Sequence, residues 1–234
     1  MMQFSRKLDI ARGRVELSHG AGGRTSTQLV NEIFYPAFAN TLLSAGNDQA
    51  IFPSPGDRLA MSTDSFVVSP LFFPGGDIGA LAVNGVINDL AMGGAQPLYL
   101  SASFIIEEGF SFAELRQIAE NMGAAARSAG VMIVTGDTKV VERGKGDGVF
   151  VTTAGVGVIP EGVNLSGDRA RPGDSVILSG SLGDHGVAVM MARQNLGFDT
   201  QIESDCAALH EMVAAMLATA GSSIRLMRDP TRGG

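Results

Sequence analysis

Carboxylate side chains recur at the expected ends of helices and strands along this chain. They are Asp48, Asp64, Asp89, Glu107 and Asp137. A hard cation such as Mg²⁺ takes carboxylate oxygens and keeps water and phosphate oxygens as its other ligands, so aspartates delivered from separate strands suit a metal-nucleotide site. Each carboxylate taken alone is more often a solvated group or a helix cap. The recurrence, and not any single residue, indicates metal-nucleotide chemistry.

The tetrapeptide Gly136-Asp137-Thr138-Lys139 is the most informative short motif. Glycine permits a close approach of the backbone, aspartate can hold a metal ion, and lysine can contact a phosphoryl group in transfer. The motif is neither a Walker A loop nor a dinucleotide fingerprint, because no G-x-x-x-x-G-K-[ST] occurs and the glycine-rich residues 19–23 follow only a short apolar stretch. It predicts phosphate contact without fixing the enzyme class.

Other chemistries fit the sequence poorly. The three histidines are dispersed and there is one cysteine, Cys206, so a structural zinc site is not expected. Ser181 and His185 are not surrounded by the G-x-S-x-G elbow of a serine hydrolase. Cys206 falls within an expected helix, where a free cysteine usually acts as a small hydrophobic residue.

The composition indicates a globular protein that does not bind nucleic acid. Of 234 residues, 45% are hydrophobic and 18% charged, and the net charge is −7, which opposes binding to phosphate backbones. The longest apolar stretch, residues 78–92, is interrupted by polar side chains and is shorter than the ~20 residues that a membrane-spanning helix needs. The N-terminus lacks the apolar core of a signal peptide, and a single cysteine requires no oxidising compartment, so we expect a cytoplasmic protein.

Hydrophobic periodicity and turn residues predict alternating helices and strands. A capping box at Ser111 and Glu114 predicts the start of one helix with particular clarity. Helices are expected over 26–43, 78–92, 111–130, 186–196 and 204–219, and strands over 58–68, 98–106, 131–134, 149–159, 175–178 and 224–228. The Gly-, Pro- and Asn-rich residues 160–173 form the expected domain boundary. The part that follows has too few elements to close a core, so we expect a truncated second domain.

Several motifs, taken in order, resemble the HypE family of hydrogenase maturation proteins. This family lies in the ATP-binding superfamily of aminoimidazole ribonucleotide (AIR) synthetase, selenophosphate synthetase and thiamine-monophosphate kinase. The motifs occupy residues 19–23, 48–50, 62–65, 71–76, 88–91, 94–97, 107–109, 135–140, 183–186 and 229–234. They span nearly the whole chain.

The resemblance implies an α+β fold of α/β layers, the PurM-like two-domain fold. Residues 1–40 would form an N-terminal segment with a glycine-rich loop and helix, and 41–160 the ATP-binding and dimerisation domain, whose sheet pairs with its copy into a β-barrel. Residues 168–234 would be the first part of the C-terminal domain. Family members run about a hundred residues further and end in an acceptor cysteine that Cys206 does not match, so we expect this chain to bind nucleotide weakly and not to complete the reaction.

The resemblance also implies an activity and partners. HypE-like proteins receive a carbamoyl group on their C-terminal cysteine from the carbamoyltransferase HypF, and use ATP to dehydrate the thiocarboxamide to a thiocyanate. The cyanide then passes to iron on the HypC–HypD scaffold. This chemistry is physically reasonable, since an amide oxygen is a poor leaving group until it is phosphorylated.

Roles follow for individual residues by the same resemblance. Asp48, Asp64, Asp89 and Asp137 would hold Mg²⁺-ATP, with Lys139 as phosphate stabiliser and Glu107 as proton acceptor. Gly136 and Thr138 would contact the nucleotide, and the loop with Thr231, Arg232 and Gly233 would approach phosphate from the second domain.

Two alternatives stay open on the sequence. One is another enzyme of the superfamily, such as a small-molecule kinase or a selenophosphate synthetase, although residues 18–24 lack the reactive cysteine of the latter. The other is a non-catalytic assembly module with structural aspartates. Metal-dependent nucleotide binding would separate an enzyme from a module.

Overall fold

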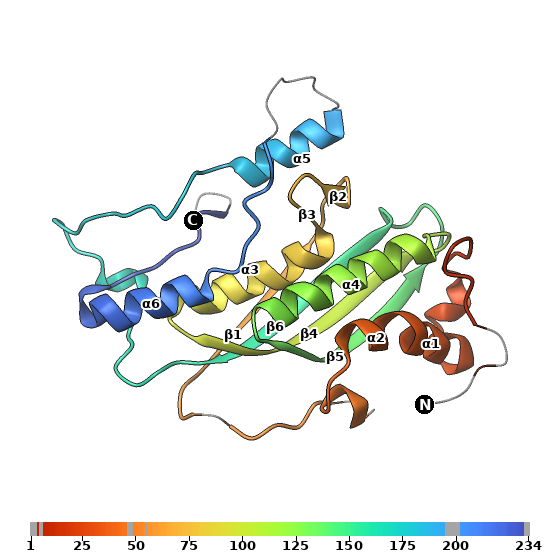
Figure 1. Cartoon of the computed structure of the whole chain (residues 1–234), viewed down its shortest axis with the longest axis horizontal. Coiled ribbons are helices and arrows are strands. Elements are labelled where there is room, and N and C mark those ends of the chain that lie inside the picture. The colour runs from red at the N-terminus through yellow and green to blue at the C-terminus, as the bar shows by residue number, and fades with distance from the viewer. Residues whose placement is uncertain (1–3, 5–6, 46–48, 55, 195–201, 232–234) are drawn as a thin grey trace.

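A four-stranded mixed sheet forms the centre of the molecule (Figure 1). The computed structural model describes residues 4, 7–45, 49–54, 56–194 and 202–231. The strand order is β1 (Leu59–Phe66), β6 (Val149–Val158), β4 (Gln96–Glu107) and β5 (Met132–Val141). β6 runs antiparallel to both neighbours, whereas β4 and β5 are parallel. The expected α+β fold is confirmed.

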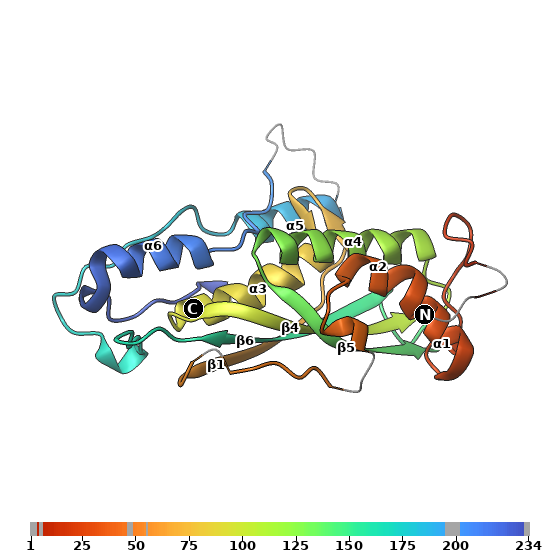
Figure 2. The same cartoon turned by 60° about the horizontal axis from the view of Figure 1, so that its bottom comes forward.

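Two helices cover one face of this sheet, as Figure 2 shows. They are α3 (Ile78–Met92) and α4 (Phe112–Ser128). Alternate residues of β6 from Val149 onward point into the core beneath them, which matches the two-residue period of a strand.

Asp77 begins α3, because its carboxylate accepts the N–H groups of Gly79 and Ala80. The predicted bounds of α3 are confirmed. Ser111 precedes α4 as predicted, but its side chain makes no cap hydrogen bond.

The N-terminal helix differs from the expected 26–43. The structure has α1 (Gly23–Leu29), a π-helical turn η2 (Val30–Phe34) and α2 (Tyr35–Phe38). Thr25 and Ser26 do not cap it, since both hydroxyls bond to the carbonyl of Ser18. The helix ends early because the Asn40 carboxamide accepts the N–H groups of Leu42 and Leu43 and donates to the carbonyl of Ile133. That side chain redirects the chain toward β5.

Strand β5 is longer than the expected 131–134. Parallel pairing with β4 continues from Met132 to Val141, so residues 136–139 lie inside an edge strand and not beyond its end. Gly136 serves this pairing directly, because a Cβ there would collide with the carbonyl oxygen of Ala102. The remaining short elements are η1 (Leu17–His19), η3 (Leu43–Ala45), β2 (Phe72–Phe73), β3 (Gly76–Asp77), η4 (Gly167–Arg169) and η5 (Gly221–Ser223).

The C-terminal part contributes two helices, α5 (Asp184–Gln194) and α6 (His210–Ala220). The predicted strands 175–178 and 224–228 are wrong: neither is paired within the described structure, and Val176 is 98% exposed. A strand needs a series of backbone hydrogen bonds to a neighbour. Among the described residues, 175–178 make none, and 224–228 make a single long-range one, from the Ser166 N–H to the Arg225 carbonyl at 3.0 Å. α6 begins later than expected. The Asn88 carboxamide on α3 donates to the carbonyl of Ala207 and accepts the N–H of Leu209, and these bonds hold the residues before His210 outside the helix.

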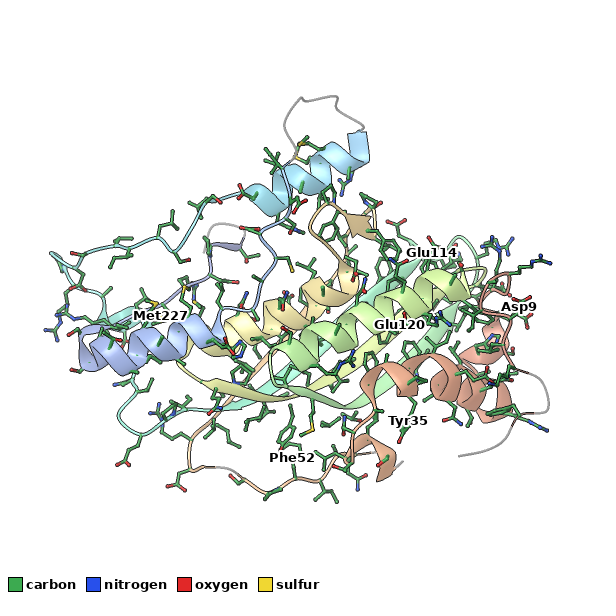
Figure 3. The ribbon with its side chains drawn as sticks, viewed as in Figure 1. Asp9, Tyr35, Phe52, Glu114, Glu120 and Met227 are labelled. Atoms are coloured by element: carbon green, nitrogen blue, oxygen red, sulfur yellow. The ribbon has the colours of Figure 1, made fainter. Side chains whose placement is uncertain are left out.

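The other face of the sheet carries no helix among the residues that the structure describes (Figure 2). The segment before β1 that carries Phe52 crosses part of it (Figure 3). The ring of Phe52 packs on Tyr99 with centroids 4.2 Å apart. Leu59 and Met61 stay 51% and 73% exposed on β1. Within the described ranges, every helix is too short or too polar to cross a membrane.

Candidate nucleotide site

A hollow of about 860 Å³ lies between the N-terminal helical segment and the edge strand β5. One end is polar and is formed by the loop around His19 and Gly20 and by residues 135–139 of β5. The other end is apolar and is lined by Phe34, Phe38, Leu42 and Leu43, among others. Pockets of this size, mostly apolar with a few polar groups, are typical of small-molecule sites.

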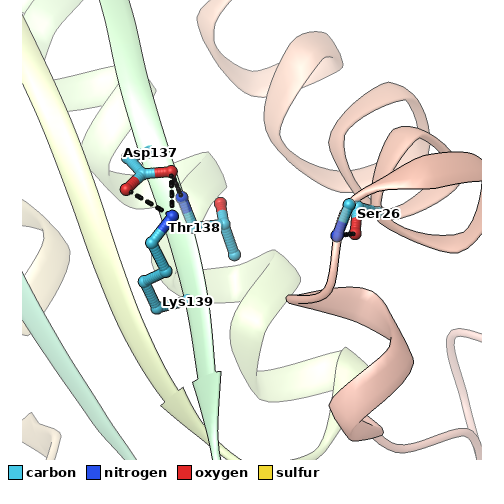
Figure 4. A network of polar contacts seen from close by, with 5 residues as sticks. Ser26, Asp137, Thr138 and Lys139 are labelled. Atoms are coloured by element: carbon cyan, nitrogen blue, oxygen red, sulfur yellow. Dashed lines mark hydrogen bonds and ion pairs between the residues drawn. The ribbon is translucent and has the colours of Figure 1, made fainter.

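Asp137 and Lys139 of β5 are among the residues at the polar end, and they form an ion pair on the face of the strand turned away from Ser26, whereas Thr138 between them is turned toward Ser26 (Figure 4). The Lys139 ammonium lies 2.9 Å from Oδ2 and 3.1 Å from Oδ1 of Asp137, and the Thr138 N–H donates to Oδ1 at 2.8 Å. The ammonium and this N–H hold the pKa of the Asp137 carboxyl below its ordinary value. Because the two side chains are 62% and 57% exposed, the pair adds little to stability. It places a cation and an anion, both exposed to solvent, at the edge strand beside the hollow.

The glycine-rich loop is packed against this strand. A Cβ on Gly20 would collide with the backbone nitrogen of Val140, so only glycine permits the approach. Gly22 has φ 82° and donates its N–H to Ser26 Oγ at 2.9 Å (Figure 4). The loop and the predicted phosphate-contacting tetrapeptide therefore form one wall.

Asp64 lies on β1, the edge strand opposite to β5, and Asp89 lies on α3 beside it. Ser62 Oγ donates to Asp89 Oδ2 at 2.6 Å, and Asp64 follows Ser62 on the same face of β1. Asp64 Oδ1 accepts the N–H of Ser65. Since β1 and β5 are the two edges of a four-stranded sheet, about 14 Å separates them at ~4.8 Å per strand. One chain thus brings Asp64 near Asp89 but not near Asp137.

The remaining predicted metal ligand, Asp48, lies outside the described residues, as do Arg232 and Gly233. No group of three His, Cys, Asp or Glu side chains in the described part of the chain is placed to hold a metal ion. Thr231 donates to Asp229 and does not line the hollow. The roles predicted for these residues stay predictions.

Glu107 is engaged by the loop between β5 and β6. Its Oε1 accepts the Gly144 N–H at 2.5 Å, and its Oε2 accepts the Gly148 N–H at 3.3 Å. These N–H groups, with the nearby charge of Arg143, hold the pKa of Glu107 below its ordinary value. A carboxylate with a lowered pKa is a weaker base, so this geometry favours an anchor for the loop over the predicted proton acceptor.

Sequence reasoning missed the opposite wall of the hollow. Phe34 and Phe38 are spaced as the apolar face of a helix, which is indistinguishable in sequence from an ordinary core face. His19 was noted only as part of a glycine-rich motif, yet it is 6% exposed and lines the hollow. Its place beside several glycines was the one available signal.

Comparison with known proteins agrees with this arrangement. Residues 46–159 match the family model of the AIR synthase related protein N-terminal domain, and residues 171–234 match the C-terminal domain of the same family. The fold and these two matches define an AIR synthase-related protein.

The chain is 67% identical over 231 residues to carbamoyl dehydratase HypE of Rhizobium leguminosarum bv. viciae, covering 99% of this chain and 66% of that protein. It is 63% identical over 234 residues to carbamoyl dehydratase HypE of Bradyrhizobium diazoefficiens, covering 100% of this chain and 68% of the relative. The chain belongs to the HypE family.

Solved structures show the same likeness. A structure of hydrogenase maturation protein HypE in complex with ATP is 49% identical and superposes with a TM-score of 0.89 over 92% of this chain and 64% of that chain. A HypE–HypF complex is 52% identical, with a TM-score of 0.74 over 88% of this chain and 66% of that chain. The chain thus spans about two thirds of the length of these proteins.

Proposed function

We propose that the hollow beside β5 binds ATP. The observation that carries this proposal is the ion pair of Asp137 and Lys139 at the polar end of a cavity whose other end is lined by aromatic and aliphatic side chains. The apolar end suits a purine base, and the polar end suits phosphates. A related structure that superposes on most of this chain contains ATP, which supports the proposal.

The activity that we propose is that of a carbamoyl dehydratase in [NiFe]-hydrogenase maturation. The phosphoryl group of ATP passes to the oxygen of a cysteine S-carboxamide, and that oxygen leaves as phosphate while the nitrogen loses its two protons. The product is an S-cyanate. Lys139 would stabilise the negative charge on the phosphoryl group during transfer, and Asp137 would hold Lys139 in position. Two relatives named carbamoyl dehydratase HypE, 67% and 63% identical to this chain, support this activity.

Mg²⁺ fits the donor set, since the predicted ligands are all carboxylates. When bound, it would neutralise charge on the phosphates. Asp64 and Asp89 share one side of β1, whereas Asp137 lies on the far edge strand, so we propose that a second copy of the chain brings them together. The proposed assembly is a homodimer in which the helix-free faces of two sheets close a β-barrel.

The proposed partners are HypF, which supplies the carbamoyl group, and the HypC–HypD scaffold, which takes the cyanide. A solved complex of HypE with HypF supports the first of these. We propose that these steps take place in the cytoplasm.

Calorimetric titration of ATP into the chain, with Mg²⁺ and with EDTA, tests the nucleotide site. We expect binding that requires Mg²⁺ and that Asp137→Ala weakens by about tenfold or more, because a charge-assisted contact is lost. Asp168→Ala is the matched control, because Asp168 is an exposed carboxylate outside the hollow. Equal affinity in wild type and Asp137→Ala would remove Asp137 from the site, and no binding by the wild-type chain would contradict an ATP site in it.

A further inference from the structure

His19 is a buried polar side chain to which the proposed function assigns no role. It is 6% exposed, and its ring meets the edge of Phe112 with centroids 5.3 Å apart. It also lines the polar end of the hollow. A buried imidazole is normally hydrogen-bonded through both nitrogens, so the partner of each nitrogen needs to be identified.

The Nδ1 atom accepts a hydrogen bond from the backbone. The N–H of Glu16 donates to it at 2.9 Å, which closes the η1 turn. Because a backbone N–H can only donate, Nδ1 carries no hydrogen, and the ring hydrogen lies on Nε2. The carbonyl oxygen of Glu16, 3.2 Å from Nδ1, is then a close neighbour and not a hydrogen-bond partner. His19 thus presents an N–H donor at Nε2.

This donor has no partner among the residues that the structure describes, because the contacts of the His19 nitrogens there are both made by Nδ1. The loop that carries the ring is fixed against β5, since Gly20 touches the Val140 backbone directly after Lys139. The loop that carries His19 and residues 136–139 of β5 therefore form the same wall of the hollow.

The charged side chains and the free N–H groups along this wall determine which ligand it can bind. Within the described lining, Asp137 and Lys139 are the only charged side chains, and they pair with each other. The Gly22 N–H is already used by Ser26 Oγ, and the Gly20 N–H by the Leu17 carbonyl. These two backbone donors are therefore not open to a polyanion that enters this end, whereas the His19 Nε2–H is.

We propose that His19 is a nucleotide-binding residue whose Nε2–H donates to a phosphate oxygen of a nucleoside triphosphate. This inference rests on the proposed function, since it concerns the same hollow. The Glu16 N–H fixes the tautomer, much as a neighbouring group fixes the histidine ligands of metals. Gly20 lets the loop lie directly against β5, so His19 stands beside the residues 136–139 that are predicted to contact phosphate.

Two substitutions separate the nitrogens. In His19→Asn the amide oxygen can replace Nδ1 as acceptor for Glu16, but the Nε2 donor is gone. In His19→Gln the amide nitrogen can replace the Nε2 donor, while the acceptor for Glu16 is lost. His210→Asn on α6 is the matched control, because His210 lies outside the hollow. Each chain is titrated with Mg-ATP by calorimetry, and thermal unfolding checks that it is folded.

We expect His19→Asn to weaken Mg-ATP binding by about tenfold, as the loss of one hydrogen bond to a charged group predicts. His19→Gln should recover most of that loss, and His210→Asn should bind as wild type does. Normal binding by His19→Asn, alongside weakened binding by Asp137→Ala, would overturn the role of His19 and leave the nucleotide site standing. Absence of binding by the wild-type chain would overturn both.

Discussion

At the scale of single residues, Cys206 shows how burial determines reactivity. The thiol is partly buried, and Asn84 Nδ2 lies 3.3 Å from its Sγ. Burial raises the pKa of the Cys206 thiol, and the carboxylates of Asp77 and Asp205 raise it further. The thiolate is the nucleophilic form, so a raised pKa lowers reactivity at neutral pH. This agrees with the expectation that Cys206 does not correspond to the acceptor cysteine of the family.

We therefore expect Cys206 to react slowly with a disulfide reagent such as DTNB at pH 7.5. Its rate should be about tenfold below that of the same chain in denaturant, since the folded chain restricts access to the thiol and the raised pKa leaves less of it as thiolate. Stopped-flow absorbance measures both rates, and Cys206→Ser supplies the background. A native rate equal to the denatured rate would contradict this account.

Individual site residues differ in how well sequence could predict them. Residues 136–139 were singled out because their types suit phosphate contact, and they do line the hollow. Glu107 was chosen for its position at a strand end, but its hydrogen bonds to the β5–β6 loop depend on residues 144–148, far away in sequence. Long-range contacts of this kind leave no local pattern.

At the scale of elements, prediction succeeded where the signal was local. α3 is bounded by its own cap residue and by Gly93, and its bounds were predicted correctly. β5 was predicted too short, because its length is set by pairing with β4 and not by its own apolar residues. Residues 175–178 have the composition of a strand, yet Ile177 is 84% exposed and unpaired in the described structure. Strand propensity becomes a strand only where a neighbour is present.

His185 is one of the residues through which helix α5 contacts the rest of the chain, together with Arg193, which donates to the Ser69 carbonyl, and the buried Val189. Its Nδ1 lies 3.0 Å from Ser204 Oγ, and its ring meets Phe73 edge-on at 5.2 Å. Burial lowers the pKa of His185, and the charge of Asp205 opposes this only in part. The unfolded chain therefore binds a proton at a higher pH than the folded chain does.

This sign predicts how stability changes with pH. As the pH falls below about 6.5, the ordinary histidine pKa, the unfolded state gains the proton first and the free energy of unfolding decreases. The decrease ends once the pH is below the lowered pKa. Urea unfolding of wild type and His185→Gln between pH 7.5 and 5 measures it, and the variant should lose less stability over this range. Parallel curves for the two chains would contradict the assignment.

At the scale of the whole molecule, the two faces of the sheet are unequal. The helices α3 and α4 bury one face, while β1 presents Leu59 and Met61 to solvent on the other, 51% and 73% exposed. Contiguous exposed apolar surface commonly marks an interface. The positions of Asp64 and Asp137 point the same way, because these two predicted ligands lie on opposite edge strands of the sheet in the described part of one chain.

The proposed dimer can be tested on this face. Sedimentation velocity should give a mass of about twice 24.3 kDa for the wild-type chain. Met61→Asp places an uncompensated charge in the proposed interface, so we expect the dissociation constant to rise by about tenfold or more. Met190→Asp on α5 is the matched control, because Met190 is 52% exposed but lies away from the sheet, and this variant should stay dimeric. If Met61→Asp also weakens Mg-ATP binding and Met190→Asp does not, the nucleotide site needs both chains. A monomeric wild-type chain that still binds Mg-ATP would show that one chain suffices and would remove the barrel from the proposal.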